Sequence, residues 1–186
     1  METIKLAQTV GKSIQDFYNK NDFGEEGGIN ESYAWIKFGF FSIPIPNFES
    51  RKDNVYFHDI SHIVTENDTN WKGESAVSAW EVASGGWKKL IIPWLLTLWA
   101  MGLGIIFYRK STLHSFEKGL TMNNAIVSGI TKNEMNEFSV AELRNVLSNK
   151  PKRNTNSTIW SLISLIVFIL PFIIGIAIVI FITKLF

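Results

Sequence analysis

The chain has 186 residues, of which 46% are hydrophobic and 13% aromatic, which suits one folded domain with an appendage and excludes a disordered chain. The formal net charge is +1, from 18 basic and 17 acidic residues, so no overall positive field draws the protein to nucleic acid. Cysteine is absent, which excludes disulfides, iron–sulfur clusters and thiolate zinc sites and leaves nitrogen and oxygen atoms to hold any metal.

One helix and one extended segment are predicted before residue 50. From Ile4 to Tyr18 apolar residues recur at helical spacing, until the turn-forming sequence NDFGEEGG ends the pattern. This first stretch lacks the apolar run of a secretory signal, so we expect the body to stay on the side of the membrane where it is made. Residues 33–48 combine aromatic residues, isoleucine and two prolines, which is typical of an extended segment or a hairpin arm.

Two of the three histidines lie in a predicted helix over residues 54–65. His58 and His62 are four residues apart, so they share one face of the helix with side chains about 6 Å from each other. A single metal ion bridges that spacing. Asp59 is either a further ligand or the carboxylate that fixes a histidine tautomer. The motif is short, and a pair of solvated surface histidines is the alternative interpretation.

A second helix, GESAVSAWEVAS, is predicted after the turn-rich sequence ENDTNWKG, running back antiparallel to the first. It carries Glu74 at its start and Glu81 two turns later, both pointing the same way. The hairpin over residues 54–86 therefore presents two histidines and a carboxylate around one point. Such a ligand set suits zinc, iron(II) or manganese(II) and leaves coordination positions open. The remaining histidine, His114, is isolated and is interpreted as a surface or core residue.

An apolar run of 18 residues, from Leu90 to Phe107, lies at the short edge of the membrane-spanning range. Two basic residues stand before it and two after it, so flanking charge gives it no orientation. A membrane span, a helix of the core and a helix in the membrane interface are the alternatives.

The end of the chain is predicted to cross a membrane. Ser139 and Glu142 have capping-box spacing and start a short amphipathic helix, and residues 151–157 form a polar linker after a body of residues 1–150. Residues 158–183 then contain no charge over 26 positions, more than the roughly 20 that span a hydrocarbon core, which predicts a transmembrane helix at 158–184. More basic residues precede this run than follow it, so the body is expected in the cytoplasm, at the inner membrane.

The sequence HDISH, followed by eleven residues and Glu74, fits the pattern HDxxH-x11-E, the metal-site signature of the coenzyme Q biosynthesis protein 4 family. The chain resembles this family over about residues 1–150, most closely at 46–86. The resemblance extends to PNFESR before the motif and to IVTENDTNWKGESAVSAWE directly after its second histidine. SFEKG at 115–119 and AELRNVL at 141–147 are less specific landmarks.

The resemblance implies a mainly α-helical fold of the ubiquinone-biosynthesis type. It also implies a divalent metal, zinc first with iron(II), manganese(II) or magnesium as alternatives, at His58, Asp59, His62 and Glu74. The expected substrate is a prenylated ring precursor that undergoes oxidative decarboxylation at ring carbon C1, and by analogy we assign proton transfer to Glu81.

The expected partners are the membrane, other quinone-biosynthesis enzymes and a second copy of the chain in a homodimer, without nucleic acid. The alternative is a non-catalytic scaffold that holds an isoprenoid lipid and organises a biosynthetic complex. A zinc hydrolase fits less well, because HDxxH lacks the general base of HExxH proteases. The transmembrane segment departs from the family's peripheral attachment and indicates a divergent bacterial member whose ring substrate the resemblance leaves open.

Overall fold

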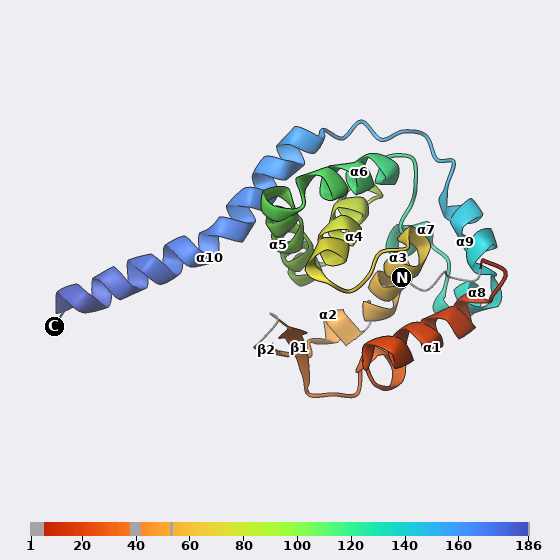
Figure 1. Ribbon diagram of the computed structural model, residues 1–186, viewed down its shortest axis with the longest axis horizontal. Coiled ribbons are helices and arrows are strands. Elements are labelled where there is room, and N and C mark those ends of the chain that lie inside the picture. Colours follow the sequence, from red (N-terminus) through yellow and green to blue (C-terminus); the bar gives the residue numbers. More distant parts are fainter. Residues whose placement is uncertain (1–5, 38–41, 53, 186) are drawn as a thin grey trace.

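The structure, a computed structural model, describes residues 6–37, 42–52 and 54–185 (Figure 1). It confirms the predicted class: a mainly helical body from which one long apolar helix, α10 (Ser157–Leu185), extends. The other elements of the described residues follow in chain order: α1 (Val10–Asn21), the short turn η1 (Glu25–Gly27), β1 (Tyr33–Lys37), β2 (Ser42–Pro46), α2 (Glu49–Lys52), α3 (Val55–Thr65), α4 (Trp71–Ala83), α5 (Ile91–Phe107), α6 (Arg109–Gly119), α7 (Ala125–Ser128), α8 (Lys132–Glu137) and α9 (Val140–Leu147).

Helix α4 is the centre of the body and packs against α3, α5 and α6. Small residues let its neighbours approach closely. A Cβ at Gly104 of α5 would overlap Ser75 of α4, and one at Gly119 of α6 would overlap the carbonyl of Trp80. One apolar cluster contains residues of α4, α5, α6 and α10. A second contains residues of α1, α3, α7, α8 and α9. The α3–α4 hairpin therefore lies between two packed clusters, which fixes both of its helices.

Helix α1 starts later than its apolar spacing predicts. The predicted start at Ile4 lies outside the described residues, and the helix itself begins at Val10 because the Oγ1 of Thr9 accepts a hydrogen bond from the backbone N–H of Lys12. Its buried face, which includes Ile14, packs against α3.

Within the extended segment predicted at residues 33–48, the strands β1 and β2 pair antiparallel, with Trp35 opposite Pro44, and residues 38–41 of the segment lie outside the described residues. The amide of Asn47 closes its base by donating to the carbonyls of Gly28 and Glu31, at 3.0 and 2.8 Å. The capping box of Ser139 and Glu142 is also confirmed.

The predicted linker is extended and is tied to the body by hydrogen bonds. The backbone N–H of Lys150 donates to the carbonyl of Thr121, and that of Arg153 donates to Leu120, both at 2.9 Å. The Arg153 guanidinium bonds to the carbonyl of Met122 and to the side chain of Asn123. The segment before α10 thus follows a defined path along the body.

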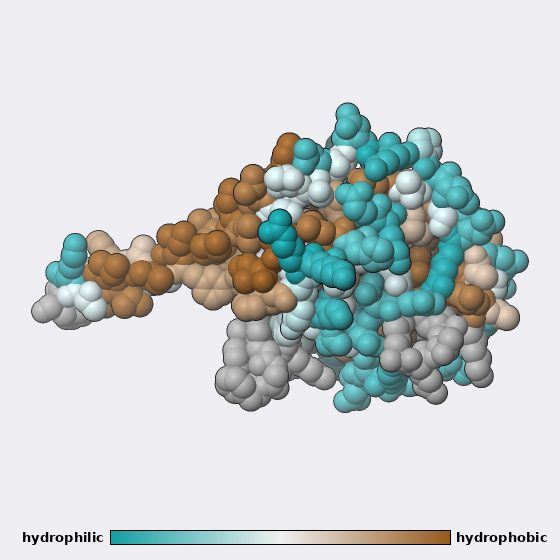
Figure 2. Space-filling model, turned by 45° about the horizontal axis from the view of Figure 1, so that its top comes forward, coloured by the Kyte–Doolittle hydropathy of each residue, from teal (hydrophilic) through white to brown (hydrophobic). Residues whose placement is uncertain are grey.

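The apolar run at 90–107 forms α5, a helix of 17 residues whose inner face is buried against α4 and α10. Of the helices in the described ranges, α10 alone is long and apolar enough to cross a membrane. Figure 2 shows the apolar residues gathered along α10 and at the adjoining end of the body, whereas the rest of the visible body is largely hydrophilic.

Candidate metal centre

The turn between α3 and α4 brings the predicted ligands together. Helix α3 ends where Glu66 adopts a left-handed conformation and its N–H bonds to the carbonyl of His62. Helix α4 begins where the side chain of Asn70 accepts a hydrogen bond from the N–H of Gly73, at 3.0 Å. A Cβ at position 73 would overlap the carbonyl of Asp68, so glycine is needed at this approach of the loop to the first turn. The next residue, Glu74, consequently faces α3.

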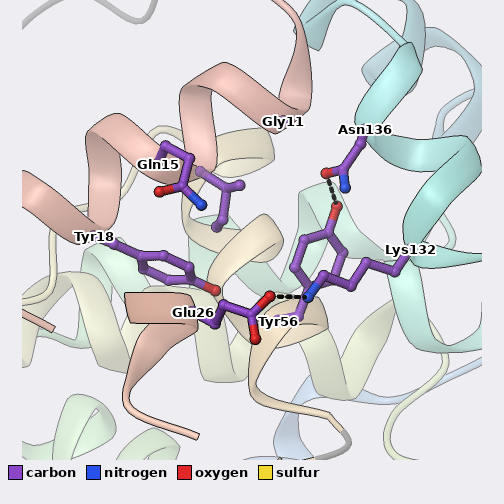
Figure 3. Close-up of a pocket in the computed structure, with 8 residues that line it drawn as sticks. Gly11, Gln15, Tyr18, Glu26, Tyr56, Lys132 and Asn136 are labelled. Carbon is purple, nitrogen blue, oxygen red and sulfur yellow. Dashed lines mark hydrogen bonds and ion pairs between the residues drawn. The ribbon is translucent and has the colours of Figure 1, made fainter. Parts of the chain in front are cut away.

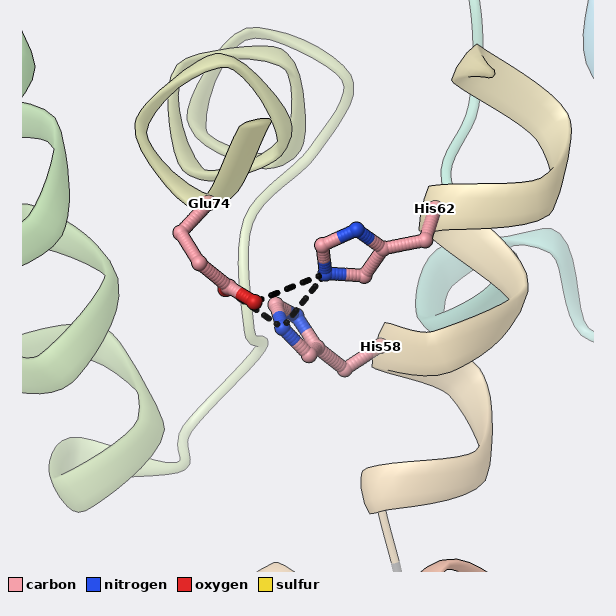
Figure 4. Close-up of side chains that lie close together, drawn as sticks. All are labelled: His58, His62 and Glu74. Atoms are coloured by element: carbon pink, nitrogen blue, oxygen red, sulfur yellow. Dashed lines mark hydrogen bonds and ion pairs between the residues drawn. The ribbon is translucent and has the colours of Figure 1, made fainter. Parts of the chain in front are cut away.

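Figure 4 shows the two imidazoles of α3 facing the carboxylate of Glu74 on α4. The Nε2 atoms of His58 and His62 are 3.4 Å apart. Glu74 places Oε2 3.5 Å from Nε2 of His58 and Oε1 3.4 Å from Nε2 of His62. The structure therefore brings together three of the four predicted ligands, with one atom of each within 4.8 Å of the others.

Hydrogen bonds at the far side of each ring determine which nitrogen faces the centre. Nδ1 of His62 lies 3.1 Å from the carbonyl of Asn67, which only accepts, so this nitrogen carries the hydrogen. Nδ1 of His58 lies 2.9 Å from Oε1 of Glu81, an arrangement in which the imidazole donates to the carboxylate. In their neutral forms both rings thus direct the Nε2 lone pair at the same point.

These distances fit a divalent metal. Ligand bonds of ~2.1 Å at tetrahedral angles separate neighbouring ligand atoms by about 3.4 Å, which matches the three contacts between His58, His62 and Glu74. The side chain of His62 is 1% exposed, whereas those of His58 and Glu74 are 25% and 27% exposed. Two histidines and one carboxylate therefore occupy one side of the centre, and the side next to His58 and Glu74 is accessible to a further ligand.

Without a metal, protons hold the group together. Burial lowers the pKa of His58, but the carboxylates of Glu81 and Glu74 outweigh it and raise that pKa well above its ordinary value. The pKa of His62 is also raised, because Glu74 outweighs the effect of burial. Burial acts to raise the pKa of Glu74, yet the two histidines hold it at about 2. A metal that binds here displaces protons from the rings.

The structure does not bring Asp59, the fourth predicted ligand, into the group. One residue along a helix is a rotation of about 100°, which turns Asp59 away from α4 towards Tyr18 and Gly27. Burial raises the pKa of Asp59 to about 6, against the opposing effect of the two histidines. Within the described ranges its Oδ2 has no hydrogen-bond partner. Asp59 therefore lies on a different face of α3 from the two histidines.

Glu81, to which we assigned proton transfer, is completely buried and contacts His58 at Nδ1. Glu74 contacts the same ring at Nε2. The position of Glu81 is that of a group that orients the imidazole, and it takes the role considered for Asp59 at the sequence level. The backbone carbonyl of Asn67 orients the ring of His62. The sequence did not predict this contact, because any residue type can supply a backbone acceptor.

A small cavity of about 110 Å³ lies apart from this centre, between α1, α8 and the start of α3 (Figure 3). Lys132 forms an ion pair with Glu26 at 3.5 Å beside it, and the hydroxyl of Tyr56 donates to Asn136 at 2.7 Å. None of the three converging ligands lines this cavity.

Comparison with family models, with curated proteins and with solved structures finds no match to this chain.

Proposed function

We propose that the protein is a membrane-anchored metalloprotein that uses a divalent ion held by His58, His62 and Glu74 to act on a lipid-soluble substrate. The observation that carries the proposal is the convergence of two Nε2 lone pairs and a carboxylate at metal-ligand spacing, with the opposite nitrogen of each ring already hydrogen-bonded. Histidines that bind a metal almost always donate their other ring N–H to a carboxylate, a backbone carbonyl or water, as both rings do here.

Each residue of the centre has a distinct task in this proposal. His62, buried and held by a backbone carbonyl, is the fixed ligand, and His58 and Glu74 border the accessible side. Glu81 holds the His58 ring in the metal-binding tautomer and increases its basicity. A bound divalent ion supplies a Lewis acid that polarises a carboxylate or carbonyl oxygen of the substrate.

The substrate class comes from the resemblance to the coenzyme Q biosynthesis protein 4 family. By that resemblance we propose a prenylated ring precursor of an isoprenoid quinone as the substrate and oxidative decarboxylation at ring carbon C1 as the reaction. Dioxygen is the two-electron oxidant and is reduced to hydrogen peroxide, a hydroxyl group replaces the ring carboxyl group, and the carboxyl group leaves as carbon dioxide. The apolar α10 supports a membrane location, and the basic residues before it support a body in the cytoplasm. Other enzymes of quinone biosynthesis and a second copy of the chain are the proposed protein partners.

The alternative is a non-catalytic scaffold. In it the metal has only a structural role, linking α3 to α4, while the body binds an isoprenoid lipid. Structural zinc sites in proteins are closed by four protein ligands. Among the residues that the structure describes, three side chains converge here, and two of them are about a quarter exposed, so the arrangement favours a centre that accepts an exogenous ligand.

The test uses the full-length protein purified in detergent, with His58→Ala compared with His114→Ala. His114 is exposed on α6 and lies outside the centre, so it controls for the loss of an imidazole. Metal content is measured by mass spectrometry of the protein, and conversion of a prenylated hydroxybenzoate by mass spectrometry of the lipid.

We expect stoichiometric metal and substrate conversion in the wild type and in His114→Ala, and loss of both in His58→Ala. Conversion that persists in His58→Ala refutes the catalytic role. Absence of metal in the wild type after growth and purification with zinc, iron or manganese refutes the metal centre.

A further inference from the structure

The outer face of α5 carries exposed apolar side chains that nothing in the described residues covers. They lie near the two ends of the helix, at residues 91–96 and 106–107, and are up to 73% exposed at Ile91 and 64% at Phe107. Helical geometry puts both groups on one side of α5, with the partly buried Trp99 and Leu103 between them. This apolar stripe comprises Ile91, Ile92, Leu95, Leu96, Ile106 and Phe107. Single exposed apolar residues are ordinary, but several on one side of a helix mark an interaction surface.

The stripe adjoins the part of α10 that is packed on the body. Trp160 of α10 stacks on Trp94 of α5, with ring centroids 5.5 Å apart. A Cβ at Gly102 would overlap Ser164 and Phe168, so the two helices are in close contact there. The apolar surface of α10 therefore continues onto α5, at the end of the body where Figure 2 shows the hydrophobic residues gathered.

The exposed length of α10 indicates how close to the membrane the body must lie. Every residue from Ile169 to Lys184 is exposed, whereas those from 157 to 168 are partly covered by the body. Those 16 exposed residues reach about 24 Å at ~1.5 Å per residue, which is less than the roughly 30 Å of a hydrocarbon core. If α10 crosses the membrane, hydrocarbon must also surround part of its packed half, and α5 lies beside that half.

The charges that flank α5 match a lipid surface. Lys88 and Lys89 stand before it, Arg109 and Lys110 after it, and all four are exposed. A helix with basic residues at both ends and an apolar outer face is suited to the boundary between acyl chains and anionic headgroups. A protein partner would not require positive charge at both ends.

We propose that α5 is a second membrane contact, lying in the interface of the bilayer with its apolar stripe against acyl chains and its flanking basic residues among anionic headgroups. The contact holds the body against the membrane instead of leaving it on a free tether. It rests on the membrane anchorage by α10 and is independent of the metal.

Because the chain has no cysteine, single-cysteine variants of the full-length protein can each be labelled with one fluorophore. Leu95→Cys reports on the stripe and Ile178→Cys on the anchor. Val146→Cys is the matched control, an exposed aliphatic position on α9, outside α5 and α10. The labelled proteins are reconstituted into phosphatidylcholine vesicles with added phosphatidylglycerol, with quenching measured for a doxyl-labelled lipid and for aqueous iodide.

We expect the doxyl lipid to quench the Leu95 label nearly as much as the Ile178 label, and the Val146 label to be quenched by iodide alone. Quenching of the Leu95 label by iodide but not by lipid overturns the proposal. So does protection of that label from both quenchers, which would indicate a second copy of the chain over the stripe. Lack of lipid quenching at Ile178 refutes the anchorage itself, a separate failure.

A second comparison tests the charges. In the Leu95→Cys background, Lys89→Glu and Lys110→Glu are expected to reduce lipid quenching in vesicles with phosphatidylglycerol. Unchanged quenching in both variants refutes the headgroup contact.

Discussion

Replacement of Glu81 by glutamine tests how far the centre depends on a residue that does not contact the metal position. The carboxylate is completely buried, and its Oε1 accepts from Nδ1 of His58 at 2.9 Å. Its Oε2 has no partner within the described residues. Glutamine has the same shape but no charge, so it keeps the side chain's volume and removes the anion that makes the imidazole a stronger ligand.

The expected loss is about 10- to 100-fold in zinc affinity, which is ~1.4–2.7 kcal/mol. The upper part of this range is favoured because the Glu81 contact is shielded from solvent. Zinc affinity is measured by competition with a chromophoric chelator on the full-length protein in detergent. Glu137→Gln on the exposed face of α8 is the control for loss of one negative charge and should bind zinc as the wild type does.

Equal zinc affinity in Glu81→Gln and in the wild type would refute the reasoning, because the His58 ring would then be held without the carboxylate. A loss as complete as that in Glu74→Gln would also refute it, since Glu81 would then behave as a ligand.

Three further predictions concern protonation and close contacts. The raised pKa of His58 stabilises the metal-free fold below the unfolded-state value of about 6.5, and this contribution is lost as the pH rises through the folded pKa. Denaturant melts with a chelator should therefore show stability falling above about pH 6.5, and melts with zinc should show the opposite trend; equal trends would contradict the metal centre. Gly73→Ala should lower the free energy of unfolding by about 1–3 kcal/mol and weaken zinc binding, because the added methyl group overlaps the carbonyl of Asp68. Gly175→Ala is the control and should change neither stability nor zinc binding, because its methyl group meets open space. Gly102→Leu should separate α10 from α5, so that a protease cuts residues 150–156 faster than in Gly175→Leu. Equal cleavage rates in the two variants would show that the close contact at Gly102 does not hold the helices together.

Sequence reasoning succeeded where one helix decides the outcome. His58 and His62 are four residues apart, which places both rings on one face of any α-helix. The uncharged run at residues 158–183 forms a helix regardless of what packs beside it. It was less accurate where a cap decides. The apolar spacing from Ile4 gave no sign that the side chain of Thr9 would start the helix at Val10.

The division of labour among the carboxylates required the tertiary structure. Asp59 is adjacent to His58 in the chain, yet the helix turns it towards α1. Glu74 and Glu81 share one face of α4, and sequence spacing treats them alike. What separates them is depth, because Glu74 reaches Nε2 of His58 at the accessible side and Glu81 reaches Nδ1 from the buried side.

The path from the centre to the apolar surface consists of aromatic side chains. Trp71 lies in the first turn of α4, three residues before Glu74, and its ring centroid is 5.8 Å from that of Trp99 on α5. Trp99 is in turn 5.2 Å from Phe168 of α10, which is 5.5 Å from Phe172. The turn of the chain that carries Glu74 is therefore in continuous contact with the helix proposed to cross the membrane. A molecule with a polar, metal-seeking head and a long apolar chain matches both ends of this path, whereas a small polar substrate would use only one.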